Sequence, residues 1–168
     1  TKQKNAIRLF TRQCLEYFSS NRKLNIPVYK EKYFDLINKG LFISLYCGDI
    51  QRACMGVVKF NSNLAKMIIK VSELVCLKDD RYSKIEQHEL AELTITIWII
   101  NNFYEFKTLD DLIIGKHGLY IISDSYSALY LPYIAVKNNW SPEEFIMETC
   151  KKAECPHDWN KIKNNILL

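Results

Sequence analysis

The chain has 168 residues, of which 48% are hydrophobic and 25% charged, and these values fit one globular domain with its own core. The formal charge is only +4, with basic and acidic residues interspersed, which argues against a nucleic-acid interface because such interfaces gather Lys and Arg on one face. No apolar run approaches the ~20 residues that a membrane span requires.

The N-terminal part predicts a helix over residues 4–20, where apolar side chains recur every three or four positions. A short helix is expected over Tyr33–Lys39, with Gly40 as its C-cap. Two strands then follow, joined by a two-residue turn at Gly48-Asp49: Leu41–Cys47 and Ile50–Phe60.

The rest of the chain continues to mix helices and strands. The predicted elements, in chain order, are a helix over 64–75, a strand over Leu93–Ile99, and two short strands over Gly118–Ser123 and Ala128–Leu131. Ser141, followed by Pro142 and by Glu144 three residues after the cap, predicts the start of a last helix. Because no regular βαβ rhythm appears, we expect an α+β fold with an antiparallel or mixed sheet flanked by helices.

Six cysteines, at positions 14, 47, 54, 76, 150 and 155, are read as free thiols of a cytoplasmic protein. Several lie on apolar helix faces, as Cys14 does, where free Cys behaves as a small hydrophobe, and the chain does not resemble a small secreted scaffold. Cys150, Cys155 and His157 lie close in sequence but lack a fourth ligand, so we predict no metal site. The sequence leaves the cofactor unknown.

The second strand of the predicted hairpin carries the candidate chemistry. A two-residue turn places Arg52 opposite Leu45 and Cys54 opposite Ile43, so that Arg52 and Cys54 project from the same face. A guanidinium beside a thiol favours the thiolate, which is the nucleophilic form. The alternative is that Cys54, among apolar neighbours, is only a core residue.

Four blocks in chain order resemble one known family. Residues 51–56, Gln-Arg-Ala-Cys-Met-Gly, line up with the Leu-Arg-Gly-Cys-Ile-Gly signature of the AMMECR-one domain family. The other blocks are 79–82, Asp-Asp-Arg-Tyr; 115–119 with 129–135; and 140–153. The resemblance covers nearly the whole chain and implies one two-lobed α+β domain over 1–168, with both termini in the larger lobe. The start at Thr1 is compatible with a piece of a longer protein.

The resemblance also selects site residues. It implies that the hairpin, the Asp79–Arg81 region and the His117 loop approach a shared cleft. Arg52, Cys54 and His117 are then candidate catalytic residues, with His117 as acid, base or thiol partner. The candidate binding residues are Asp79, Arg81 and Gly56. For Asp79 and Arg81 we favour the alternative of a structural ion pair after the preceding helix, and for His117 a turn residue remains open.

Several positions depart from the family pattern. Ala53 stands in place of the usual glycine, and its Cβ is expected to obstruct a close ligand approach or a positive φ. Gln51, Asp80 and Tyr133 also differ from the family's usual residues. The chain is therefore interpreted as a divergent member whose ligand or partner surface has changed.

Two functions stay open. The first, slightly favoured by the substituted signature, is a binding or accessory module in a modification or redox pathway. Its partners would be Memo-type proteins or radical S-adenosylmethionine enzymes by family analogy, or else a small molecule or peptide. The second is a thiol-dependent enzyme that uses Cys54, Arg52 and His117. A membrane partner is not expected.

Overall fold

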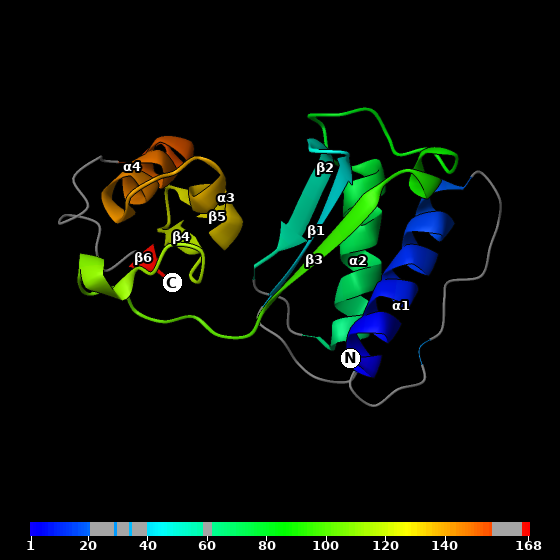
Figure 1. Cartoon of the computed structure of the whole chain (residues 1–168), viewed down its shortest axis with the longest axis horizontal. Coiled ribbons are helices and arrows are strands. Elements are labelled where there is room, and N and C mark those ends of the chain that lie inside the picture. The colour runs from blue at the N-terminus through cyan, green and yellow to red at the C-terminus, as the bar shows by residue number, and fades with distance from the viewer. Residues whose placement is uncertain (21–28, 30–33, 35–39, 59–61, 156–165) are drawn as a thin grey trace. The chain divides into compact units, whose positions relative to one another are not determined.

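The computed structural model describes residues 1–20, 29, 34, 40–58, 62–155 and 166–168. These residues form two compact units, Thr1–Asn102 and Phe103–Leu168, each with its own hydrophobic core (Figure 1). The N-terminal helix belongs to the first unit and the C-terminal strand to the second, which differs from the expectation that both termini lie in one lobe. None of the helices in the described part of the chain is long and apolar enough to cross a membrane.

The first unit packs two helices on one face of a three-stranded antiparallel sheet with strand order β2-β1-β3 (Figure 1). Its elements are α1 (Lys2–Ser19), β1 (Gly40–Cys47), β2 (Ile50–Val57), α2 (Leu64–Leu77) and β3 (Thr94–Ile100). Alternate residues of β1, including Ile43 and Leu45, are fully buried in the core that α1 and α2 cover. As predicted, Cys14 belongs to that core.

A β-bulge changes the predicted register of the hairpin. The turn itself is as expected, since Cys47 pairs with Ile50 and Gly48 adopts the left-handed conformation with a φ of 57°. Beyond the turn, however, Ala53 lies opposite Leu45, and Arg52 is the extra residue on β2. The prediction that Arg52 faces Leu45 and Cys54 faces Ile43 is therefore wrong by one residue.

The second unit packs helices on another antiparallel sheet, with strand order β5-β4-β6. Its elements are β4 (Leu119–Ile122), β5 (Ser127–Tyr130), α3 (Pro132–Lys137), α4 (Pro142–Ala153) and β6 (Ile166–Leu167). The predicted capping box at α4 is confirmed, because Ser141 Oγ accepts from the N–H of Glu144 and the Glu144 carboxylate accepts from the N–H of Ser141. The fold is thus α+β, but with two small antiparallel sheets instead of one sheet.

The remaining differences concern short elements. The helix predicted over 33–39 lies outside the described residues apart from position 34, and Gly40 begins β1 instead of capping a helix. A Cβ at Gly40 would lie 2.5 Å from the carbonyl oxygen of Val57, so close strand pairing explains this glycine. The helix α3 and the strand β6 were not predicted.

Candidate functional site

The outer edge of β2 is closed by side chains from the segment that follows α2. Because β1 is the central strand, β2 is an edge strand of this sheet within the part of the chain that the structure describes. At that edge the backbone N–H of Cys54 donates to Asp79 Oδ2 at 2.8 Å, and Arg81 Nη2 donates to the carbonyl oxygen of Cys54. Asp79 and Arg81 therefore satisfy both backbone groups of Cys54, as a paired strand would.

Asp79 and Arg81 also bind each other through two parallel hydrogen bonds. Arg81 Nε lies 2.8 Å from Asp79 Oδ1, and Arg81 Nη2 lies 2.8 Å from Asp79 Oδ2, so the favoured interpretation of an ion pair is confirmed. Burial by itself would raise the pKa of Asp79, but the hydrogen bonds from Arg81 and from the Cys54 N–H outweigh it and lower that pKa. Asp79 is thus held as a carboxylate.

The exposure of this ion pair is strongly asymmetric. The Asp79 side chain is only 2% exposed, whereas that of Arg81 is 52% exposed. The Arg81 guanidinium lies 5.5 Å from the centre of the Tyr82 ring, which adds a cation–π contact. A buried anion therefore fixes a solvent-facing cation beside Cys54.

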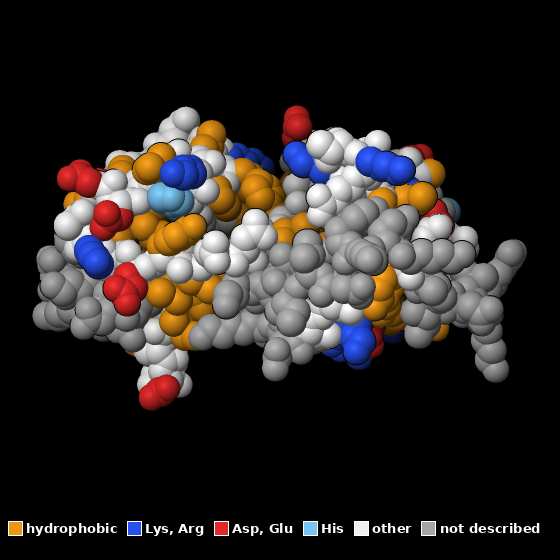
Figure 2. All heavy atoms as spheres, turned by 90° about the horizontal axis from the view of Figure 1, so that it is seen from below, with side chains coloured by type: hydrophobic (Ala, Val, Ile, Leu, Met, Phe, Trp, Pro, Cys, Tyr) orange, Lys and Arg blue, Asp and Glu red, His pale blue; other side chains and the backbone are white. Residues whose placement is uncertain are grey.

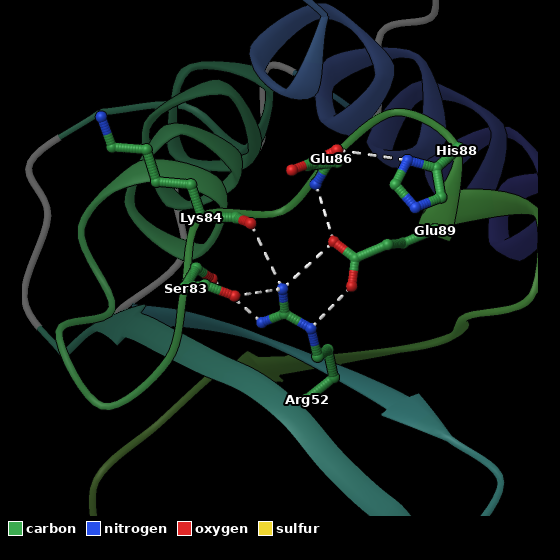
Figure 3. A network of polar contacts seen from close by, with 6 residues as sticks. All are labelled: Arg52, Ser83, Lys84, Glu86, His88 and Glu89. Carbon is green, nitrogen blue, oxygen red and sulfur yellow. Dashed lines mark hydrogen bonds and ion pairs between the residues drawn. The ribbon is translucent and has the colours of Figure 1, made fainter.

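Arg52 binds the loop that precedes β3 (Figure 3). Its Nε and Nη2 atoms donate to the two carboxylate oxygens of Glu89, at 2.8 and 3.1 Å. Its Nη1 donates to the carbonyl of Ser83, and Nη2 also donates to Ser83 Oγ and to the carbonyl of Lys84. Each guanidinium nitrogen thus has an acceptor in the 83–89 segment, and support of a Cys54 thiolate by Arg52 remains a prediction.

The thiol of Cys54 is partly buried and lies 3.2 Å from Ser44 Oγ, with either atom able to donate. Ser44 is the partner of Cys54 on β1 and is fully buried. Ala53, in contrast, is only 1% exposed and belongs to the core, and its φ is negative. Its Cβ therefore does not obstruct the face that carries Cys54, which corrects the expected effect of this substitution.

Gly56 has a packing role in the structure. A Cβ at Gly56 would lie 2.2 Å from Phe42 Cδ1, because Phe42 is its partner on β1 and the ring lies over the glycine backbone. The close approach of this ring requires glycine. A contact of Gly56 with a ligand remains a prediction.

His117 lies in the second unit, on the turn that leads into β4. Its Nδ1 atom lies 2.9 Å from the carbonyl oxygen of Asp111 and 3.3 Å from the backbone nitrogen of Ile113. The ring also lines an open cavity of about 380 Å³, together with Tyr104, Glu105, Asp111, Lys116 and Leu168. The backbone contacts agree with the alternative of a turn residue, and a cleft shared with the hairpin remains a prediction.

The described residues contain no group of three or more His, Cys, Asp or Glu side chains arranged to hold a metal ion, and His157 lies outside them.

On the face in Figure 2, basic and acidic side chains lie scattered among hydrophobic ones, without one basic patch. Burial raises the pKa of both Cys14 and Cys76 to about 12, which makes these core thiols poor nucleophiles.

Three residues of the site were not found by sequence reasoning: Ser44, Ser83 and Glu89. Ser44 had a signal, since it is a lone polar residue among apolar neighbours in a strand. Glu89 and Ser83 meet Arg52 across 37 and 31 residues of chain, so no local pattern indicates the contact.

The fold and site define a two-unit α+β domain whose cysteine-bearing edge strand is held by an Asp–Arg pair. The AMMECR1 family model matches residues 9–167, and the chain therefore belongs to that family. A solved structure of an uncharacterised protein from Pyrococcus horikoshii has a similar fold, with a TM-score of 0.79 and 23% identity. That match covers 97% of this chain and 85% of the other.

Two sequence relatives are archaeal proteins. A protein of Pyrobaculum aerophilum is 32% identical over 70% of this chain, and the match spans 58% of that protein's length. A protein of Nanoarchaeum equitans is 29% identical over 94% of this chain and 91% of its own. The names of these relatives state no activity.

Proposed function

We propose that the chain is a binding or accessory module that engages a protein partner at the Cys54 segment of β2, with Arg81 as the principal contact. The observation that carries the proposal is the fixed, half-exposed guanidinium of Arg81, which Asp79 holds against the Cys54 backbone. A planar guanidinium that is already oriented loses little entropy on binding a carboxylate, so it suits recognition of an acidic partner surface.

A thiol enzyme is less well supported by the same geometry. A cysteine nucleophile is activated by a neighbouring base or by a lowered pKa. The hydrogen-bond partner of the Cys54 thiol is instead the hydroxyl of Ser44. The guanidinium of Arg52 is occupied by Glu89 and the 83–84 backbone, and the charge of Arg81 is paired with Asp79. Cys54 is therefore treated as part of a contact surface.

The class of partner comes from the family analogy alone. Memo-type proteins and radical S-adenosylmethionine enzymes of a modification or redox pathway are the partners to test first. A small molecule or peptide with a carboxylate is the second candidate, because it would satisfy the same guanidinium.

The experiment compares three variants in partner capture and in a product assay of the pathway. Arg81→Lys keeps the positive charge beside Asp79 but removes the planar fork, so capture should weaken about tenfold or more. Cys54→Ser should leave capture within about twofold of wild type, because a hydroxyl nearly preserves shape and hydrogen bonding. Lys70→Ala, in an exposed ion pair on α2, is the matched control and should not change capture. If Cys54→Ser abolishes product while all three variants bind normally, the enzyme interpretation replaces ours.

A further inference from the structure

The C-terminal end of α4 brings two cysteines together through a specific backbone motif. The N–H of Cys155 donates to the carbonyl of Cys150 at 3.1 Å, and the N–H of Glu154 donates to the carbonyl of Lys151 at 3.2 Å. Glu154 adopts the left-handed conformation, with a φ of 55°. These features define a Schellman motif, in which the first and last residues, here Cys150 and Cys155, make a side-chain contact.

The contact between these two residues is a thiol–thiol hydrogen bond inside the core of the second unit. Cys150 is fully buried and Cys155 is 5% exposed. Burial, followed by the hydrogen bond with Cys155, raises the pKa of Cys150 to about 12. Both cysteines are in the reduced state in the structure.

The backbone geometry suits a covalent bridge. A backbone hydrogen bond between two residues places their Cα atoms about 5 to 7 Å apart, and disulfides span about 4.4 to 6.8 Å between Cα atoms. Because the thiols already touch, small side-chain rotations can bring the sulfur atoms into bonding distance. The bridge closes over the last turn of a helix, which frays at lower free energy than a core opens.

We propose that Cys150 and Cys155 form a reversible disulfide modification site whose oxidant is a peroxide. The thiolate of Cys155, the more exposed residue, attacks one peroxide oxygen; the O–O bond breaks, and one water leaves after protonation. Fraying of the last turn of α4 exposes both thiols to water, where the Cys150 thiolate can form; it attacks the sulfenic sulfur of Cys155, the S–O bond breaks, and a second water leaves. Two thiols and one hydrogen peroxide become one disulfide and two waters, with two electrons passing from sulfur to oxygen.

A second buried cysteine pair provides an internal comparison. Cys14 on α1 and Cys76 on α2 are also buried, but the Cys76 thiol points to the carbonyl of Leu15 at 3.8 Å. Their oxidation would require the two helices to open a core that the α4 terminus does not involve. The bridge between Cys150 and Cys155 should therefore form before one between Cys14 and Cys76.

The test uses the full chain with Cys47→Ser and Cys54→Ser, which removes the exposed and partly buried thiols. Hydrogen peroxide at neutral pH should lower the intact mass by about two units, and dithiothreitol should restore it. Lys151 and Lys152 lie between the cysteines, so trypsin cuts within the loop and the bridge should appear as two linked peptides. Adding Cys155→Ser should abolish the mass loss, whereas adding Cys76→Ser should not.

Cys155→Ala, which keeps a small apolar side chain, replaces Cys155→Ser if the serine variant does not fold. Three outcomes would each overturn the proposal. They are a bridge between Cys14 and Cys76, sulfinic acid at Cys155 without a bridge, or four unchanged thiols under conditions that fully oxidise Cys47 and Cys54 of the parent chain.

Discussion

Arg81 donates a hydrogen bond from Nη2 to the carbonyl oxygen of Cys54, while Asp79, its ion-pair partner, accepts the N–H of the same cysteine. Asp79 and Arg81, in the segment after α2, thus fix the backbone of Cys54 on the sheet edge. Any change in this ion pair should affect both the stability of β2 and the surface around Cys54.

Asp79→Asn should reduce the free energy of unfolding by about 1 to 3 kcal/mol. Asparagine can still accept the N–H of Cys54, but it cannot neutralise Arg81 through two charge-assisted hydrogen bonds. Urea unfolding measures the change. Asp80→Asn, at an exposed neighbouring position, is the control and should change the free energy by less than about 0.5 kcal/mol. Equal effects of the two variants would show that the Asp79–Arg81 ion pair contributes no specific stability.

The contribution of Asp79 should depend on pH. Its pKa is lowered in the folded state, so its stabilising effect is fully present above its unfolded pKa of about 3.9 and is lost as pH falls through the folded pKa. The difference in Tm between wild type and Asp79→Asn should therefore be constant from pH 7 to 5 and narrow below about pH 4. A difference that stays constant to pH 2.5, with both proteins folded, would contradict this assignment.

Arg52→Lys should destabilise the fold by about 1 to 2 kcal/mol, because a single ammonium cannot reproduce the contacts to Glu89, Ser83 and Lys84. Partner capture should be unchanged at a temperature where the variant is folded. Differential scanning calorimetry and capture assays on the same preparation separate the two effects. Weakened capture without a loss of stability would show that Arg52 belongs to the binding surface.

Iodoacetamide should label Cys47 and Cys54 before Cys14 and Cys150. The reason is exposure, since Cys47 is exposed and Cys54 partly buried, whereas Cys14 and Cys150 are fully buried with pKa values raised to about 12. Peptide mapping after brief alkylation at neutral pH gives the order. Labelling of Cys14 at the rate of Cys54 would show that the first unit opens readily.

Local patterns in the sequence predicted most helices and strands because each carries its own signal. The apolar spacing around Cys14 and the capping box at Ser141 depend on residues only three or four apart. The turn at Gly48-Asp49 was equally local. The α3 helix was missed although Pro132 at its first position is a start signal, because the preceding residues read as a strand.

The site was harder to predict because its geometry depends on one inserted residue and on distant contacts. A two-residue turn fixes register only as far as the next bulge, and the extra residue at Arg52 shifts each later pair by one. Cys54 consequently meets Ser44 and not Ile43. The partners of Arg52 lie more than 30 residues away, so tertiary structure alone brings Glu89 to it.

In the proposed function, a protein partner covers the Cys54 segment of β2 beside Arg81. The most direct measurement is the iodoacetamide labelling rate of Cys54 with and without a saturating Memo-type or radical S-adenosylmethionine partner, with exposed Cys47 as the reference thiol. The partner should slow labelling of Cys54 about tenfold or more relative to Cys47. A labelling rate of Cys54 that is unchanged in the confirmed complex would contradict it.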